Sequence, residues 1–266
     1  MTARATLFAW ALAVALAGCQ SPAPQQRAES PAPTPPGLPP LAAQRIVCLG
    51  DSITDGHTYA LLVQQALREA GRPVPVMIGA GAGGDNAAGM LARLDRDVLA
   101  YQPDLVALGT GINDQRLTPA EYETALRALY DRLRAARVPV LVLTLTVLAP
   151  RHAAAVPQLA AFDAVLRRLA REYGYRLADV QTLQARAAAA GVGLHEPDGV
   201  HLNLAGYQVL ARAVLDALGH ADVAVPEQFR PPLLPGLITD WRLRPAPDQT
   251  PLTAATLATL APSRAW

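Results

Sequence analysis

Three side chains of this sequence have the types and spacing that nucleophilic chemistry needs. Ser52 lies in the run Gly-Asp-Ser-Ile-Thr at 50–54, directly after a short apolar stretch, so we expect it at a turn from strand to helix. There its backbone N–H lies near the positive end of the helix, which suits a nucleophile whose attack creates an oxyanion. Asp198 stands three positions before His201, close enough to orient the ring and leave its other nitrogen as a base. Taken alone, the first block is equally typical of a serine that merely caps a helix.

Two further blocks carry groups that can stabilise a negative charge. Residues 79–86 read Gly-Ala-Gly-Ala-Gly-Gly-Asp-Asn, and such a glycine-rich turn lets the backbone approach a ligand closely and offer N–H donors. Residues 109–114 read Gly-Thr-Gly-Ile-Asn-Asp, where the amide of Asn113 is able to donate to the same oxygen. Both blocks follow apolar runs, so we expect both at the ends of strands.

The elements that must position these blocks are short strands alternating with helices. Apolar runs predict strands at 46–49, 74–78, 105–108, 140–145 and 175–179. Helical patterns predict helices near 59–70, 87–99, 119–137, 159–173 and 204–218. The third of these helices has a clear start, because Thr118 and Glu121 can form a capping box around Pro119.

This alternation predicts an α/β fold with a mainly parallel sheet covered by helices on both faces. A sheet of about five strands suits a flavodoxin-like three-layer α/β/α sandwich, in which ligands bind at the carboxyl ends of the strands. The four blocks are therefore expected to meet at one edge of the sheet.

Taken together, the four blocks resemble those of the SGNH hydrolases, also called the GDSL esterases and lipases. The resemblance implies that Ser52 is the nucleophile and that Asp198 and His201 complete a catalytic triad. It further implies an oxyanion hole built from the N–H groups of Ser52 and Gly84 and the amide of Asn113. The implied reaction is acyl transfer to water through a covalent acyl-enzyme, with no metal and no organic cofactor.

The blocks occur in the order of that family and cover most of residues 45–219. The main departure lies in the second block, where Gly83 precedes Gly84 in place of the more usual serine. Gly83 therefore stays a rival for the role of oxyanion glycine.

Two alternative sites depend on a cofactor, and the spacing disfavours both. Gly79, Gly81 and Gly84 match a dinucleotide fingerprint, but they follow the second strand, whereas that motif follows the first strand of its fold. His195 and His201 lie near two acidic residues, yet the histidines are six positions apart with a proline and a glycine between them. A helical pair of zinc ligands needs i, i+4 spacing, so a metal site is disfavoured.

Two further alternatives concern the scaffold. The Gly-x-Ser-x-Gly elbow of the α/β-hydrolases is absent from the sequence, which disfavours that neighbouring fold. A surface-binding lipoprotein on an inactive hydrolase scaffold is the non-enzymatic alternative. A binder has no need of a complete triad and a full set of oxyanion donors, so the sequence favours the enzyme.

The first 19 residues predict the export signal of a bacterial lipoprotein. An apolar stretch at 7–17 is too short to span a bilayer, which takes about 20 residues. Leu-Ala-Gly-Cys at 16–19 resembles a lipobox, which implies that Cys19 is lipidated and begins the mature chain. Gln20 follows it, which by analogy with enteric lipoproteins favours sorting to the outer membrane. Ordinary signal cleavage with an incidental cysteine is the alternative.

The chain is expected to divide into four segments. These are a signal peptide at 1–19, a Pro- and Ala-rich tether at 20–44, the hydrolase domain at 45–220 and a Pro-rich extension at 221–266 with a candidate strand at 238–243. The extension either packs along the domain or begins a second module. We expect an exported cell-envelope lipoprotein, periplasm-facing or at the outer membrane, that contacts the membrane only through its lipid anchor.

Composition excludes several classes of function. The net charge is +1 and no basic run interrupts the sequence, which argues against nucleic acid as a partner because phosphate binding needs clustered positive charge. All 23 basic residues are Arg, so Schiff-base chemistry and a Walker-type phosphate lysine are excluded.

The expected substrate is a carboxylic ester. A short acyl group is favoured, such as an O-acetyl group on a sugar, because no long apolar loop suggests a groove for an acyl chain. A lysophospholipase or thioesterase acting on envelope lipids is the alternative, since the residues that choose among these substrates lie in loops.

Several neighbouring residues are expected to be structural. Asp51 and Thr54 are predicted to shape and cap the turn at Ser52, and Asp114 to accept backbone hydrogen bonds. Cys48 lies in an apolar run and is expected to be an inert core thiol. Other residues have no partner evident in the sequence and are expected at the surface or in loops, namely His57, His152 and His220.

Overall fold

A five-stranded parallel sheet lies at the centre of residues 42–230, the part of the chain that the computed structural model describes. Its strands run in the order β2-β1-β3-β4-β5, and every neighbouring pair is parallel. Their bounds are β1 (Arg45–Gly50), β2 (Val76–Gly81), β3 (Leu105–Gly109), β4 (Val140–Leu143) and β5 (Arg176–Ala178). This is the flavodoxin-like order, so the expected fold class is confirmed.

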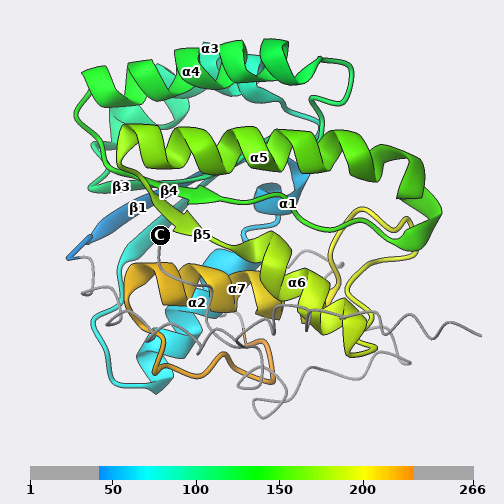
Figure 1. Ribbon diagram of the computed structural model, residues 1–266. Helices are drawn as coiled ribbons and strands as arrows, with labels where there is room; N and C mark the ends of the chain where they lie inside the picture. Colours follow the sequence, from blue (N-terminus) through cyan, green and yellow to red (C-terminus); the bar gives the residue numbers. More distant parts are fainter. Residues whose placement is uncertain (1–41, 231–266) are drawn as a thin grey trace, which may run out of the picture. The chain divides into compact units, whose positions relative to one another are not determined.

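Helices cover both faces of the sheet, as Figure 1 shows. One face carries α3 (Ala87–Asp97), α4 (Pro119–Ala135) and α5 (Val156–Tyr173). The other face carries α2 (Thr58–Glu69), α6 (Val180–Ala189) and α7 (Leu204–Leu218). Shorter helical segments are α1 (Ser52–Asp55) and the 3₁₀ turns η1 (Leu99–Tyr101) and η2 (Pro150–Ala155).

β1 is buried on both faces because its side chains alternate between two apolar cores. Ile46 and Cys48 pack in the core shared with α2 and α7, while Val47 and Leu49 pack in the core shared with α3 and α4. Burial raises the pKa of the Cys48 thiol to about 12, so this cysteine stays protonated. Its expected character as an inert core thiol is confirmed.

Side-chain caps set the starts of α4 and α7 where the sequence predicted them. The Thr118 hydroxyl accepts from the N–H of Glu121 at 3.3 Å, and the Glu121 carboxylate accepts from the N–H of Thr118 at 2.8 Å, which completes the capping box. Asn203 caps α7 by accepting from the N–H of Gly206 at 3.0 Å.

The second strand ends later than its apolar run predicts. β2 continues through Gly81 because its glycines pair in register with β1, Cys48 with Gly79 and Gly50 with Gly81. The expectation that the whole glycine-rich block forms a turn was therefore wrong. The turn begins only at Ala82, because Gly79 and Gly81 belong to the strand, at positions where neighbouring atoms leave little room for a side chain.

The helix α6 is missing from the elements that the sequence predicts. The apolar residues on its buried side are Val180, Leu183 and Ala187. Asp179, which the sequence assigns to the fifth strand, instead caps α6 by accepting from the N–H of Thr182 at 3.2 Å. A weakly amphipathic, Ala-rich segment gives little periodic signal, so only its packing against α7 reveals it.

The first residues of the C-terminal extension, 221–230, pack along the helical face formed by α2 and α7. The Gln208 amide on α7 donates to the carbonyl of Pro226 at 2.7 Å. The Gln65 amide on α2 donates to the carbonyl of Gln228 at 2.9 Å. The candidate strand at 238–243, like Cys19 and the signal peptide, lies outside the described residues.

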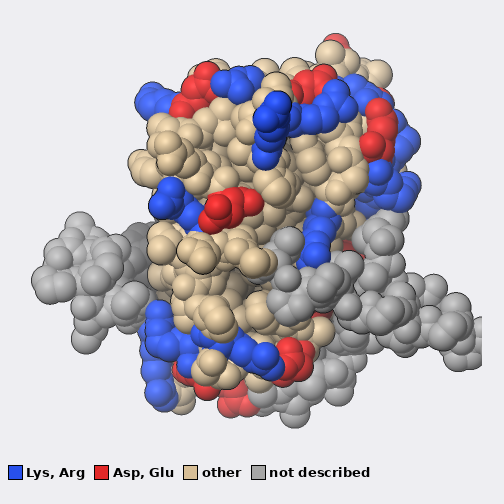
Figure 2. Space-filling model, turned by 90° about the vertical axis from the view of Figure 1, so that its left-hand side faces the viewer, with Lys and Arg blue, Asp and Glu red and all other residues tan. Residues whose placement is uncertain are grey.

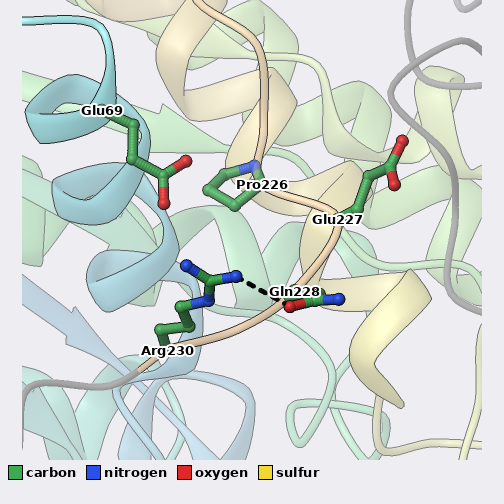
Figure 3. Close-up of a pocket in the computed structure, with 5 residues that line it drawn as sticks. All are labelled: Glu69, Pro226, Glu227, Gln228 and Arg230. Carbon is green, nitrogen blue, oxygen red and sulfur yellow. Dashed lines mark hydrogen bonds between the residues drawn. The ribbon is translucent and has the colours of Figure 1, made fainter.

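A cavity of about 460 Å³ lies where this segment meets the end of α2 (Figure 3). Glu69, Pro226, Glu227, Gln228 and Arg230 line it, and the Arg230 guanidinium donates to the side chain of Gln228 at 3.0 Å. None of these residues belongs to the four candidate blocks. The cavity is therefore separate from any chemistry that the blocks perform.

The surface mixes charges of both signs. Figure 2 shows basic and acidic side chains interspersed on the side of the molecule that lies at the left in Figure 1. Ion pairs such as Arg132 with Asp95, at 2.6 Å, are typical of this surface. Among residues 42–230, no helix combines the length and the apolar character that crossing a bilayer requires.

We predict that Gly81→Ala destabilises the fold. A Cβ at this position would lie 2.3 Å from the backbone N of Asp55, so α1 would have to move away from β2. Overpacking of this kind typically lowers the free energy of unfolding by about 1–3 kcal/mol. Gly193→Ala is the control, because nothing lies within 4 Å of its Cβ position. Denaturant unfolding of both variants checks the prediction, and equal stabilities would contradict it.

Candidate active site

Ser52 opens α1 directly after β1, at the carboxyl edge of the sheet. The residue that caps this helix is Asp51, whose carboxylate accepts from the N–H of Ile53 at 2.9 Å. The buried Thr54 fills the space beside Gly50, where a Cβ would lie 2.2 Å from the Thr54 hydroxyl. The expected structural roles of Asp51 and Thr54 are confirmed, so the Ser52 hydroxyl is not needed as a cap.

The structure joins Ser52, His201 and Asp198 in one hydrogen-bonded chain. His201 Nε2 lies 2.9 Å from Ser52 Oγ, although the two residues are 149 positions apart in sequence. His201 Nδ1 lies 2.6 Å from Asp198 Oδ2. A carboxylate only accepts, so Nδ1 carries the proton and Nε2 is left to accept from the serine hydroxyl. This arrangement suits activation of a serine by a general base.

Asp198 is held as an anion by its own turn. Partial burial opposes ionisation, but the N–H groups of Val200 and His201, at 2.8 and 2.9 Å from Oδ1, and the His201 ring together lower the pKa of Asp198 to about 2. The carboxylate of Asp198 is therefore ionised at neutral pH. A permanent negative charge at this position fixes the tautomer of His201.

The turn that carries Asp198 is anchored from outside by the segment that starts η2. The Arg151 guanidinium donates to the carbonyls of Pro197 and Asp198, the latter at 3.0 Å. His152 Nε2–H donates to the same Asp198 carbonyl at 2.8 Å. No partner of His152 is evident in the sequence, and the structure supplies one in this carbonyl. Nothing local in the sequence marks this contact, because Arg151 and Asp198 are 47 positions apart.

Candidate oxyanion donors lie in the turns that follow β2 and β3, the two strands that flank β1. In the turn after β2, Ala82 N–H donates to Gly50 O at 3.0 Å and Asp85 N–H donates to Ala82 O at 3.1 Å. Gly83 and Gly84 lie between Ala82 and Asp85, and the N–H groups of these two glycines have no acceptor among the described residues. Gly84 has a φ of 78°, which favours glycine there. Both glycines remain able to donate to a ligand.

The turn after β3 is tied to the turn after β2. Asn113 Nδ2 donates to the carbonyl of Asp85 at 2.9 Å, which uses one of its two amide protons. Asp114 accepts from the N–H of Ala87, the first residue of α3, at 3.3 Å. The predicted role of Asp114 as an acceptor for the backbone is confirmed. The Asn113 amide keeps a second N–H for a ligand.

The remaining histidines take up structural positions. His57 is partly buried just before α2, where its Nε2–H donates to the carbonyl of Met77 at 3.0 Å, and burial lowers its pKa. The expected loop position of His57, between α1 and α2, is confirmed, and the partner that the sequence does not reveal is Met77, 20 positions further along the chain. His195 Nε2–H donates to the carbonyl of Val147 at 2.9 Å. In the described part of the chain, no three His, Cys, Asp or Glu side chains are grouped so that they could hold a metal ion.

Comparison with known proteins gives consistent matches. Residues 48–209 match the model of the GDSL-like Lipase/Acylhydrolase family. Esterase TesA of Pseudomonas aeruginosa is 28% identical over 189 residues, which cover 66% of this chain and 89% of that protein.

Solved structures share the fold. LAE5, an alpha/beta hydrolase enzyme from the metagenome of Lake Arreo, Spain, matches with a TM-score of 0.60 and 28% identity, covering 67% of this chain and 96% of that one. Axe2, an acetylxylan esterase from Geobacillus stearothermophilus, matches with a TM-score of 0.60 and 22% identity, covering 66% and 94%. The second likeness is one of fold alone.

Asp51 is a buried carboxyl group beside Ser52, with only 4% of its surface exposed. Burial raises its pKa to about 6, although the N–H of Ile53 and the nearby His201 partly offset this. A folded-state pKa above the unfolded value of about 3.9 means that the folded state favours the protonated group. Its contribution to stability is therefore full below about pH 4 and is lost as the pH rises through about 6.

We predict that Asp51→Asn removes this pH dependence. Asn keeps the capping oxygen but carries no charge, so the variant gains stability relative to wild type between about pH 4 and about pH 7, by on the order of 3 kcal/mol. Denaturant unfolding of both proteins at the two pH values measures the difference. A difference in stability that does not change with pH would contradict the assignment.

Proposed function

The chain belongs to the GDSL-like lipase/acylhydrolase family and is a carboxylic ester hydrolase, and we propose that it works through an acyl-enzyme formed on Ser52. The observation that carries the proposal is the pair of hydrogen bonds made by His201, 2.9 Å to Ser52 Oγ and 2.6 Å to Asp198. Few arrangements other than a nucleophile and its base require a serine, a histidine and an ionised carboxylate in line.

In the first half of the proposed reaction, His201 Nε2 takes the proton of Ser52 as Oγ attacks the ester carbonyl carbon. The C–O bond to the alcohol then breaks, and His201 returns the proton to the departing alkoxide. Asp198, already ionised, stabilises the imidazolium that forms in between. In the second half, His201 takes a proton from the water that attacks the acyl carbon. The bond from that carbon to Ser52 Oγ then breaks, and His201 returns the proton to Oγ, which releases the acid and restores Ser52.

The negative charge on the carbonyl oxygen needs donors that are in place before the reaction begins. The proposed donors are the first N–H of α1, at Ser52, a glycine N–H in the turn after β2, and the free N–H of Asn113. Gly84 is the glycine that the family resemblance favours, with Gly83 as its rival. Losing one such donor typically lowers kcat by about 10²–10³.

For the substrate we propose an ester with a short acyl group, such as an acetylated sugar. A long acyl chain needs a continuous apolar surface to bury it. In residues 42–230 the exposed large hydrophobic side chains are Val74, Val76, Tyr101 and Val156, and none of them belongs to the four blocks. The proposal is supported by Axe2, which shares the fold and is an acetylxylan esterase.

We predict that the purified protein hydrolyses p-nitrophenyl acetate and that Ser52→Ala lowers kcat by about 10³ or more. Thr124→Ala, which removes an exposed hydroxyl on α4, is the matched control and should keep full activity. Activity that survives in folded Ser52→Ala would refute the proposed nucleophile. A higher kcat/KM on p-nitrophenyl decanoate than on the acetate would refute the short acyl group.

We also propose that Cys19 carries a lipid anchor that holds the enzyme in the cell envelope. The lipobox-like residues 16–19 and the apolar stretch before them support it. Cys19→Ser should move the protein from the membrane fraction to the soluble fraction and abolish labelling by fatty acid. Cys48→Ala removes the other cysteine and should leave the protein at the membrane. A Cys19→Ser protein that still sediments with membranes would refute the anchor.

A further inference from the structure

Arg93 on α3 holds two of the strand-end turns together. Its side chain is only 13% exposed and its donors reach three acceptors. Nε donates to Asp85 Oδ2 at 2.7 Å, one terminal nitrogen donates to the Gly50 carbonyl at 3.0 Å, and the other lies 3.4 Å from Asp97 Oδ2. Gly50 and Asp85 are 35 positions apart in sequence, and Arg93 bonds to both.

The two acceptors lie at sensitive places. Gly50 is the last residue of β1, two positions before Ser52, and Asp85 directly follows Gly84. One planar guanidinium therefore spans from the turn that presents Ser52 to the turn that carries the candidate oxyanion glycine. A fork with two bonds in fixed directions determines both the separation and the orientation of these turns.

The third turn joins the same network through Asp85. The Asp85 carboxylate accepts from Arg93, while its backbone carbonyl accepts from Asn113 Nδ2 at 2.9 Å. A residue held by its side chain in this way presents its carbonyl in one direction only. Asn113 is thereby linked to Arg93 through Asp85.

The helix makes room for this contact. Asp85, Gly89, Arg93 and Asp97 follow one another at intervals of four, so they form one row along α3 and the turn before it. A Cβ at position 89 would lie 1.9 Å from Asp85 Oδ1. Gly89 thus lets the Asp85 carboxylate lie against the helix and reach Arg93 one turn further on.

We propose that Arg93 is the positioning residue of the oxyanion hole. It sets the distance from the Ser52 turn to the Gly84 turn, and through Asp85 it orients the Asn113 amide. This inference rests on the proposed function. Stability alone is a poor explanation of the contact, because apolar residues often replace a buried ion pair with no loss of stability.

The test compares two matched double variants of the full-length protein. Arg93→Met/Asp85→Asn removes the buried ion pair at the site. Arg212→Met/Asp216→Asn removes a buried ion pair on α7, where Arg212 lies 2.6 Å from Asp216 and also donates to the carbonyl of His220. We expect the first variant to lose about 10–100-fold in kcat on p-nitrophenyl acetate, with KM changed less than about threefold. The second variant should keep its kcat within about twofold.

Two readouts distinguish positioning from a general loss of stability. A boronic acid forms a tetrahedral adduct on a nucleophilic serine, so its affinity should fall by the same factor as kcat. The acid limb of the pH profile should not move, because Asp198 and His201 are untouched. Arg93→Lys keeps the charge but cannot form the two-pronged contact, so it should show most of the loss even if the double variant folds poorly.

Coupling to Asn113 tests the route of the effect. Asn113→Ala alone removes the amide donor, so adding Arg93→Met/Asp85→Asn to it should cause a smaller loss than the same double variant causes in the wild-type background, because only the effect on the Ser52 and Gly84 turns remains. Full additivity of the two losses, an unchanged kcat in folded Arg93→Lys, or a shifted acid limb would each overturn the inference. Activity that survives Ser52→Ala refutes the proposed function itself, whereas activity that needs Ser52 but not Arg93 refutes only this inference.

Discussion

The hydrogen bond between His201 Nε2 and Ser52 Oγ joins two residues 149 positions apart, and the rest of the site holds its two ends in place. The serine end is fixed by β1, which is buried on both faces, and by the Asp51 cap of α1. The histidine end lies in the turn between α6 and α7, outside the sheet. Asn203 anchors it to α7 on one side, and Arg151 and His152 anchor its carbonyls on the other.

Electrostatics give the two carboxyl groups next to this bond opposite characters. Asp198 lies in a partly exposed turn and accepts three hydrogen bonds, so it is anionic and able to orient His201. Asp51 is almost fully buried, and its bond from the N–H of Ile53 only partly offsets this, so burial dominates and favours the protonated form. An aspartate thus serves as the electrostatic partner of His201 at position 198 and as a helix cap at position 51.

Much of the fold was predictable because a parallel strand covered on both faces must be an uninterrupted apolar run. β4, with the sequence Val-Leu-Val-Leu, shows this pattern clearly. Prediction of secondary structure failed where the local sequence pattern differs from the role that a segment has in the folded protein. The end of β2 is rich in glycine, which reads as a turn but serves to admit α1 beside Gly81. α6 has only two large apolar residues, and its alanines lie on both its buried and its exposed side, so its period is weak.

The sequence by itself determined which chemical groups the site contains and the edge of the sheet at which they gather. Three of the four blocks follow an apolar strand, and parallel strands bring such ends to one edge, whereas the block with Asp198 and His201 lies in the turn between α6 and α7. The tertiary structure alone decided which groups touch. The distance from His201 to Ser52, the contact of Arg151 with Asp198 and the reach of Arg93 to Gly50 join residues 43 to 149 positions apart. Such contacts depend on how whole layers of helix and sheet pack, and no local pattern of residues encodes that packing.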